Sequence, residues 1–419
     1  MARSHVPASD AAQRQGVRTL PRNVWVVTIT SFLTDVSSEM VLNLLPLFLA
    51  GSLGVKTNVI GLIEGVADTT ASLLKVVSGW LSDRLGSRKG LAVTGYAIST
   101  VSKPFLYLAS TWSGVLAVRF ADRIGKGIRT APRDALIAAT VDARQRGLAF
   151  GLHRAGDTAG AALGLAAALI VVWAAQGEQI DLARGTFQTI VLVSVIPAAL
   201  AVLILALGAH DVPVVEKRPP VRLTVRGIDA RYRLFLVIVA VFSLGNSADA
   251  FLILRANALG LSVVGVLGML ITFNVVYMLI SEPAGALSDR VGRWRLLAGG
   301  WLFYALVYLG FAAADAAWQV WMLYGLYGVY YGMTYGVSKA LVADLVPRPQ
   351  LGTAYGLYDA TVGLMALPAS LIAGILWQGV SRWDGLGPSA PFTFGAGMAL
   401  LAVALLPLVR RGSGADRSR

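Results

Sequence analysis

The sequence predicts an all-α membrane protein whose twelve transmembrane helices form two pseudo-symmetric six-helix bundles. Three observations predict this fold class: long apolar runs recur along all 419 residues, a loop motif is duplicated at a fixed offset, and basic residues concentrate in alternate loops. Only 14% of the residues are charged, whereas 56% are hydrophobic. A soluble domain needs a more charged surface, so this composition indicates a chain embedded in lipid.

The apolar runs predict the helices one by one. They are continuous, which indicates membrane helices and not the alternating strands of a barrel. A helix needs about 20 apolar residues, at about 1.5 Å each, to cross a hydrocarbon core of about 30 Å. The predicted spans are residues 24–50, 57–81, 91–110, 113–139, 148–173, 187–208, 234–256, 261–287, 296–314, 317–343, 353–378 and 389–408.

One linker divides the chain. The stretch between the sixth and seventh spans contains proline and many charges, which is typical of a connection outside the membrane. The residues before Trp25 are polar and basic and contain no apolar stretch followed by a cleavage site, so we expect no cleaved signal peptide. The predicted domains are a cytoplasmic tail 1–23, a first bundle 24–208, a cytoplasmic linker 209–233, a second bundle 234–408 and a tail 409–419.

The distribution of the net charge of +13 predicts the topology. Basic residues gather in both tails, in the linker, and in the loops after the second, fourth and eighth spans, whereas the alternate loops contain few beyond Lys56, Arg184 and Arg382. This positive-inside pattern predicts an even number of spans with both termini in the cytoplasm, and we expect the plasma membrane, the cell inner membrane, as the location. Because the positive charge is explained by the membrane topology, it does not indicate binding to nucleic acid, and we expect no nucleic-acid partner.

The loop after the second span of each half carries the same motif, Gly-x-Leu-Ser-Asp-Arg-x-Gly followed by basic residues. The offset from Asp83 to Asp289 is 206 residues, and the same offset aligns Gly54 with Gly260. Parallel repeats of this kind build many transporters. The motif residues are Gly79, Asp83, Arg84, Gly86, Arg88 and Lys89 in the first half and Gly285, Asp289, Arg290, Gly292 and Arg293 in the second.

This duplicated motif resembles the loop motif of the major facilitator superfamily, and the resemblance extends from about Trp25 to Arg410. It implies two six-helix bundles around a central cavity, which rock to give alternating access. It also implies that the motif residues form a cytoplasmic gate. This chain departs from the family pattern at Ser87, where a basic residue is usual, and Arg88 and Lys89 stand next to it.

The motif has a physical purpose. Its glycines, Gly86 and Gly292, allow a tight turn between two helices. The aspartates can accept backbone N–H bonds at a neighbouring helix N-terminus. Arg84 and Arg290 can form ion pairs that break when the halves move. The alternative is that the loop is only a basic connector.

Two predicted spans carry acidic residues at membrane depth. Asp35 lies about 17 Å into the first span and Glu39 follows one turn later on the same face. In the second span, Glu64 and Asp68 are again four residues apart, and Lys75 shares their face. Ionisable residues within a membrane are costly and mark functional sites. The four acids are therefore the candidates for proton coupling.

The fourth span carries a basic stripe that contains Arg119, Arg123, Lys126 and Arg133. Arginine favours contact with carboxylate or phosphate groups. Members of the superfamily often have an arginine followed by glycines in this helix, but Arg123 and Lys126 are additional charges that the common drug-efflux version lacks. Arg119, Arg123 and Lys126 are therefore substrate-binding candidates, and they predict a substrate with negative charge.

Two interpretations of these charges stay open. In the first, acids of spans one and two form structural ion pairs with bases of spans three and four, Lys103 included, because pairing is how buried charges survive. In the second, Asp35 or Glu39 binds and releases a proton while the basic residues hold an anionic substrate group. A carboxyl group removed from water favours its neutral form, so it can exchange a proton near neutral pH.

The second half has few charges and many tyrosines. Asp249 and Arg255 in span seven and Asn274 in span eight are among its sparse polar groups, whereas spans ten and eleven are rich in tyrosine. A tyrosine that faces a cavity offers an apolar wall with a hydrogen-bonding tip, although some will serve only in packing. Asn274, Tyr327 and Tyr331 are the substrate-binding candidates of this half.

The sequence contains no catalytic constellation. It has no cysteine, only three histidines and no ATP-binding loop, so we expect no enzyme activity, no cofactor and no bound metal. We predict a secondary transporter that exports a small organic solute, with protons as the coupling ion and the lipid bilayer as its environment. We expect a monomer. The alternatives are a proton-coupled uptake symporter and, in a different class, a membrane sensor or scaffold that does not transport.

Overall fold

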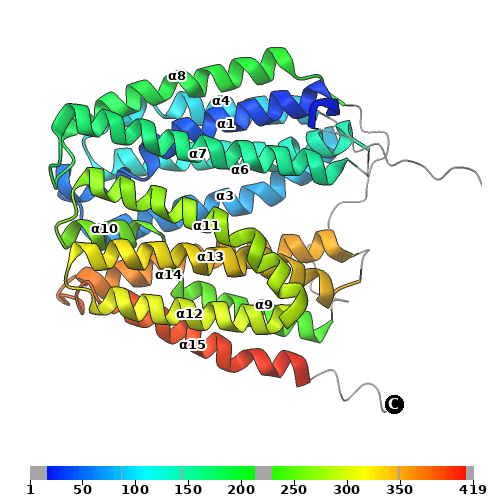
Figure 1. Ribbon diagram of the computed structural model, residues 1–419. Helices are drawn as coiled ribbons and strands as arrows, with labels where there is room; N and C mark the ends of the chain where they lie inside the picture. Colours follow the sequence, from blue (N-terminus) through cyan, green and yellow to red (C-terminus); the bar gives the residue numbers. More distant parts are fainter. Residues whose placement is uncertain (1–16, 86, 143–144, 213–228, 348–349, 412–419) are drawn as a thin grey trace, which may run out of the picture.

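A computed structural model describes residues 17–85, 87–142, 145–212, 229–347 and 350–411, except for the side chains of Asp83, Arg410 and Arg411. The described residues form a bundle of long, nearly parallel helices (Figure 1). The helices of the N-terminal half are α1 (Arg22–Leu42), α2 (Leu45–Leu47), α3 (Thr57–Leu85), α4 (Arg88–Ser102), α5 (Phe105–Leu108), α6 (Trp112–Thr140), α7 (Arg146–Gln176) and α8 (Arg184–Gly208), with a 3-10 turn η1 (Val17–Thr19) and a π-helical turn η2 (Phe48–Ser52). Those of the C-terminal half are α9 (Ala230–Gly245), α10 (Ala250–Ala258), α11 (Val263–Val291), α12 (Arg293–Ala313), α13 (Ala317–Leu345), α14 (Leu351–Gln378) and α15 (Ala390–Arg411).

Within the described residues, twelve helical units cross the bundle, which confirms the predicted fold class. Eight of them, within the described part of the chain, are long and apolar enough to cross a membrane by length and composition alone. The other four are α3 and α6, which carry several charges, α4 continued by α5, and the tyrosine-rich α13. Each of α3, α6 and α13 has 29 residues, or about 44 Å of helix, and is therefore long enough to span.

The two halves share one packing pattern. In the N-terminal half, α1 packs on α7 and α8, and α6 packs on α3 and α4. In the C-terminal half, α9 packs on α14 and α15, and α13 packs on α11 and α12. The aligned glycines Gly54 and Gly260, which precede α3 and α11, both have left-handed backbones, with φ of +61° and +88°. The sequence repeat is therefore also a repeat of structure.

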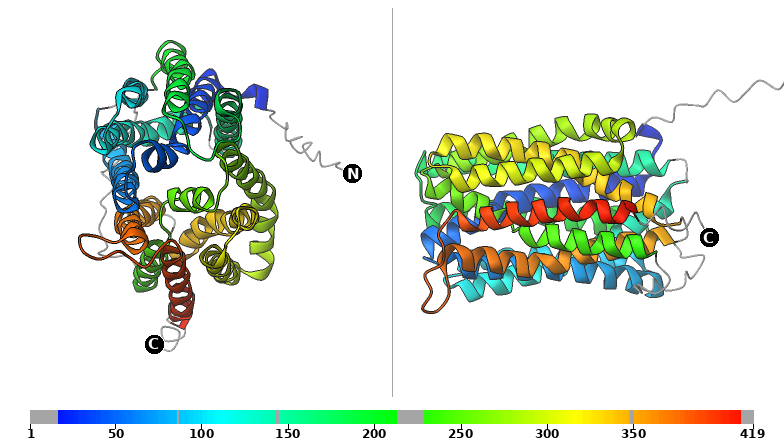
Figure 2. Two further views of the ribbon diagram at one scale, coloured as in Figure 1. Left: turned by 90° about the vertical axis from the view of Figure 1, so that its left-hand side faces the viewer. Right: turned by 90° about the horizontal axis from the view of Figure 1, so that it is seen from below.

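The halves lie side by side around a common axis (Figure 2). They touch along two seams, α3 against α14 and α7 against α11. Helix α1 begins and α15 ends at one end of the bundle, which we call the termini end; the opposite end is the far end (Figure 1). At the far end the Thr57 N–H donates to Gln378 Oε1 at 2.6 Å, and Asn257 Nδ2 donates to the Ile180 carbonyl at 2.8 Å. These bonds hold the two halves together there.

Three predicted spans are interrupted, which is a correction to the sequence analysis. The first breaks at Asn43–Leu44, the third at Lys103–Pro104, and the seventh at 246–249. The break in the seventh span begins after Gly245 and contains Asn246 and Ser247, and all three residue types favour turns. The other helix ends fall within about four residues of the predicted ones. The predicted linker and both tails lie largely outside the described residues, so their structure is not discussed.

Candidate functional site

A large and a small cavity lie between the halves, both lined by described residues. The larger has a volume of about 1370 Å³ and reaches the termini end, because Arg84 at the end of α3 and Gly352 at the start of α14 line it. Its wall is rich in aromatic rings, and we call it the aromatic cavity. The smaller has a volume of about 200 Å³ and we call it the charged cavity. Its ionisable lining residues are Asp35, Glu39, Glu64, Asp68, Asp122, Asp249, Arg119, Arg123, Lys126 and Arg129.

The charged cavity brings together most of the predicted site. All four proton-coupling candidates and all three basic candidates line it. They come from α1, α3 and α6, so the same-face arguments for each helix correctly place these side chains toward one space. The cavity also contains Asp122, Arg129 and Asp249, which the sequence analysis did not select.

Two glycines allow α6 to present its charges to this cavity. A Cβ atom on Gly125 would lie 2.5 Å from the Ser99 hydroxyl of α4, and one on Gly127 would lie 2.5 Å from the Leu74 Cβ of α3. These approaches leave no room for a side chain on that face of the helix. The glycine face therefore packs on α3 and α4, and the basic stripe turns toward the space between the halves.

One buried ion pair crosses the N-terminal half. Arg119 Nη2 lies 2.5 Å from Glu64 Oε2, and the two side chains are only 4% and 8% exposed. This pair fits the structural interpretation of the membrane charges. Lys103 does not form the ion pair that this interpretation expects, because its ammonium donates to the hydroxyls of Ser37 at 2.6 Å and Ser38 at 3.1 Å.

Arg123 and Lys126 are differently placed. Arg123 is 7% exposed, and its buried Nε has no hydrogen-bond partner in the described part of the chain. Lys126 has an exposed side chain that lines the cavity, and no ion pair of Lys126 with a described residue is found. The Arg123 charge is removed from bulk water, which is costly without a partner, whereas the Lys126 ammonium stays accessible from the cavity. These two cations are therefore available to an anionic group.

The acids of the N-terminal half also differ from one another. Glu64 is paired with Arg119, and Glu39 Oε2 accepts a hydrogen bond from Asn43 Nδ2 at 2.7 Å. The carboxyl groups of Asp35 and Asp68 accept no hydrogen bond from any described residue. Asp35 is half-buried in the cavity wall and interacts electrostatically with Lys126. Of the four candidates, Asp35 and Asp68 are therefore the two whose carboxyl groups are not held by a described residue.

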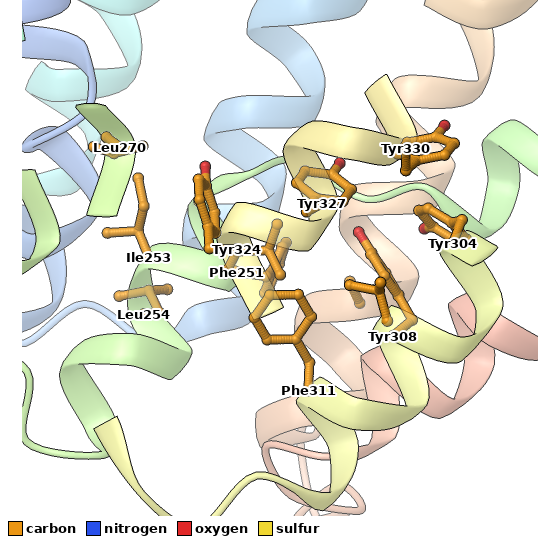
Figure 3. Close-up of a cluster of buried hydrophobic side chains, with 14 of the residues drawn as sticks. Phe251, Ile253, Leu254, Leu270, Tyr304, Tyr308, Phe311, Tyr324, Tyr327 and Tyr330 are labelled. Atoms are coloured by element: carbon orange, nitrogen blue, oxygen red, sulfur yellow. The ribbon is translucent and has the colours of Figure 1, made fainter. Parts of the chain in front are cut away.

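The C-terminal half contributes Asp249, which lies in the break between α9 and α10. The Tyr327 hydroxyl donates to Asp249 Oδ1 at 3.1 Å and lies 3.4 Å from Asn246 Oδ1. Tyr327 is fully buried in a cluster of aromatic rings from α12 and α13 (Figure 3). The sequence signal for this site was an aspartate within an apolar run, two residues after the turn-forming Gly245, Asn246 and Ser247.

The other two candidates of this half differ in position. Tyr331 lines the aromatic cavity and packs edge-on against Tyr327, with ring centroids 5.2 Å apart. Asn274 lines neither cavity, and its Nδ2 donates to the Leu270 carbonyl of its own helix at 2.9 Å. Of the three candidates, only Tyr331 lines a cavity, whereas the fully buried Tyr327 contacts the charged cavity only through its hydrogen bond to Asp249.

The loop motif lies at the termini end. Gly292 has a φ of +93°, so it makes the left-handed turn expected between α11 and α12. In the second half Arg293 makes the ion pairs, at 2.5 Å from Asp344 and 3.6 Å from Asp289, and no ion pair of Arg290 with a described residue is found. In the first half the Arg84 guanidinium lies 5.3 Å from the Trp80 ring centroid. Gly86 and the Asp83 side chain lie outside the described residues.

A residue that the sequence analysis missed caps α4. Asp211 Oδ1 accepts hydrogen bonds from the backbone N–H groups of Arg88 at 3.1 Å and Lys89 at 3.2 Å, and Oδ2 accepts one from the Ser87 hydroxyl at 3.0 Å. A carboxylate at a helix N-terminus satisfies free N–H groups and complements the helix dipole. Asp211 directly follows α8, so it joins the end of the N-terminal half to the loop motif.

Comparisons with known proteins agree with this architecture. A sequence profile described as Major Facilitator Superfamily matches residues 27–366 and, in a second match, residues 234–419. An uncharacterized MFS-type transporter of Methanocaldococcus jannaschii is 34% identical over 395 residues, which are 93% of this chain and 95% of that protein. Among solved structures, a bacterial homologue of the human lysosomal transporter Spinster, in an inward-facing and occupied conformation, has a TM-score of 0.74 at 14% identity and covers 93% of this chain and 96% of its own. The human organic anion transporter MFSD10 has a TM-score of 0.65 at 18% identity and covers 92% and 99%.

Proposed function

Since the chain belongs to the major facilitator superfamily, we propose that it couples the movement of protons to that of an organic solute with an anionic group. As a member of this family, it is a multi-pass secondary transporter of a small molecule and not an enzyme. The observation that carries this proposal is the charged cavity. Two unpaired cations, Arg123 and Lys126, and two unbonded acids, Asp35 and Asp68, share about 200 Å³ between the halves.

The anionic group binds Arg123 and Lys126. Charge-assisted hydrogen bonds to a carboxylate or phosphate are stronger than bonds between neutral groups, and Arg123 can make two of them at once. Arg119 does not take part directly, because Glu64 neutralises its charge. It keeps the wall of the cavity in place.

Asp35 carries the proton. When Asp35 is ionised, its negative charge attracts Lys126, with which it interacts electrostatically. When Asp35 is neutral, Lys126 is free to bind the anionic group. The proton and the anionic group therefore favour each other's binding, which is the linkage that moves both in the same direction.

We propose that the termini end faces the cytoplasm of a cell whose inner membrane holds the protein as a monomer. The structure is then open to the inside, because the aromatic cavity reaches that end while hydrogen bonds between the halves close the far end. Alternating access requires that the far-end bonds break and that the gate motif, with the aromatic cavity wall near Arg84, closes.

Export by exchange with protons is the second candidate. The observation in its favour is that the aromatic cavity, in this conformation, admits a solute from the proposed cytoplasmic side. Exchange requires that proton and solute compete, whereas the electrostatics of Asp35 and Lys126 favour joint binding. The two candidates therefore predict opposite signs of proton movement.

Proteoliposomes loaded with a pH-sensitive dye separate these candidates. N-acetylphenylalanine, an aromatic carboxylate, is added outside, and liposomes without protein correct for passive entry. Proton symport acidifies the lumen, whereas exchange makes it alkaline. The Asp35→Asn variant is expected to lose at least about nine-tenths of the pH change, because its side chain cannot exchange a proton, while Asp315→Asn in an exposed loop is the matched control. Binding of organic anions without any pH change in the wild-type protein would show that proton coupling is wrong.

A further inference from the structure

The two sides of the charged cavity differ in their free charges, because the cations Arg123 and Lys126 lie on the N-terminal side, next to the unbonded acids Asp35 and Asp68. The N-terminal half contributes Arg123 and Lys126, which have no ion-pair partner among the described residues. Of the residues that the C-terminal half adds to the lining, Ala248, Asp249, Ala250 and Ile253, only Asp249 is ionisable. A solute that fills the cavity therefore meets cations on one half and a carboxylate on the other.

Asp249 is suited to a cationic group. One carboxylate oxygen accepts the hydrogen bond from Tyr327 at 3.1 Å, and no described cation forms an ion pair with it. The side chain is half-buried, so a ligand in the cavity can reach it. The nearby acids Asp68, Glu39 and Glu64 interact electrostatically with Asp249. Together they make a negative potential that attracts a positive charge.

The balance of charge argues against a purely anionic solute. Six acidic and four basic side chains line the charged cavity. Even with a proton on Asp35, five acids face four bases, so a solute with only negative charge would add to the excess of acids, whereas a solute with one charge of each sign adds none. Because electrostatic interactions are strong in a cavity with little water, this difference matters for affinity.

Tyr327 is fully buried between the charged cavity and the aromatic one. Its hydroxyl lies between Asp249 of the charged cavity and Asn246, which lines the aromatic cavity, at 3.1 Å and 3.4 Å. The rings of Tyr330 and Tyr331 continue along the aromatic cavity. An apolar or aromatic body that extends from Asp249 toward the termini end would face these rings.

We infer that the substrate is a small zwitterion with an aromatic or apolar body. Its anionic group binds Arg123 and Lys126, its cationic group binds Asp249, and its body packs in the aromatic cavity. This inference rests on the proposed function and narrows the substrate class. Such a ligand spans both halves, so its binding energy depends on their separation and differs between the two states of the transport cycle.

A matched set of probes tests this class on the purified full-length protein. Phenylalanine and glycylphenylalanine are zwitterions with different charge separations, N-acetylphenylalanine is the anionic counterpart, and phenylalanine amide is the cationic counterpart. Apparent affinities are measured from the ligand-induced rise in unfolding temperature. At least one zwitterion is expected to bind about tenfold more tightly than both singly charged probes, which corresponds to one additional charge pair.

Variants assign each charge to its partner. Asp249→Asn is expected to remove the preference for the zwitterion while N-acetylphenylalanine still binds, and Arg123→Gln is expected to weaken both. Asp315→Asn, the same change in an exposed loop, leaves the preference intact. Equal affinity for the zwitterions and N-acetylphenylalanine overturns the inference, as does the absence of binding by every probe or a preference that survives in Asp249→Asn. The proposed function is judged separately, by the sign and the Asp35 dependence of proton movement.

Discussion

The two halves of this transporter have the same scaffold and different interiors, as α6 and α13 show most directly. Both helices have 29 residues and occupy equivalent places in their halves. At matching positions from their first residues, Arg119 corresponds to Tyr324, Asp122 to Tyr327 and Lys126 to Tyr331. Charges of the N-terminal half are thus replaced by tyrosines in the C-terminal half.

This difference teaches that the duplicated backbone and the binding chemistry are set separately. Packing requires only that each helix present small or apolar residues to its neighbours, and both halves do so. The side chains that face the space between the halves do not contribute to that packing in the same way. One half can therefore hold charges while the other forms an aromatic wall, and together they suit a solute with a charged and an apolar part.

The largest expected effect comes from breaking the buried charge pair of the N-terminal half. Glu64→Gln should lower the free energy of unfolding by about 3 kcal/mol, because Arg119 is left buried without its partner. The measurement is chemical unfolding in detergent micelles, followed by tryptophan fluorescence. Glu39→Gln, which changes an acid held within its own helix by Asn43, is the control with a smaller loss.

A second variant keeps this prediction open to contradiction. The double change Glu64→Gln with Arg119→Gln removes both charges and should recover most of the lost stability. If the single variant is as stable as the wild-type protein, or the double variant is less stable than the single one, the pair does not stabilise the fold. The charges of the N-terminal half would then all be functional in origin.

An intermediate effect distinguishes a binding arginine from a structural one. Arg255 of the C-terminal half donates to the carbonyls of Ala314 at 2.6 Å and Phe311 at 3.3 Å, so it holds the end of α12. Arg255→Gln should lower the free energy of unfolding by about 1–3 kcal/mol, because these carbonyls lose their donor. Arg123→Gln should cost less stability but reduce binding of N-acetylphenylalanine by at least about tenfold.

The two arginine variants serve as controls for each other, because the chemical change is the same. Unfolding temperature and ligand-induced stabilisation are measured side by side on both. If Arg255→Gln weakens binding of N-acetylphenylalanine as much as Arg123→Gln does, in protein that is still folded, then the distinction between a structural and a binding arginine is wrong.

The smallest effect is expected at the ion pair that joins the halves. Lys75 Nζ lies 3.2 Å from Asp359 Oδ2 on the wall of the aromatic cavity, and the side chains are 40% and 34% exposed. Water and salt screen such a pair, so Asp359→Asn should change the free energy of unfolding by less than about 1 kcal/mol. Comparing unfolding at low and high salt checks this, because the difference from the wild-type protein should shrink as salt rises. A loss as large as that of Glu64→Gln contradicts it.

Much of the site could be predicted from sequence because helical periodicity is strong. Glu64 and Asp68 share a face of α3, and Arg119 and Arg123 share a face of α6, and all four line the charged cavity. Asp249 was overlooked as a site residue, because its role depends on a helix break and on a tyrosine 78 residues away. Asp211 was missed for a similar reason, since its partners belong to a helix that begins 123 residues earlier in the chain.

The sequence by itself determined that this chain is a duplicated bundle of membrane helices with charges inside, because hydropathy, glycine turns and repeat offset are local properties of the chain. The tertiary structure alone decided which charges are paired. Arg119 and Arg123 are one turn apart on the same stripe, yet Arg119 meets Glu64 at 2.5 Å while the Arg123 Nε has no partner in the described part of the chain. Periodicity gives the direction of a side chain, whereas the distance to a partner on another helix depends on how closely the helices pack.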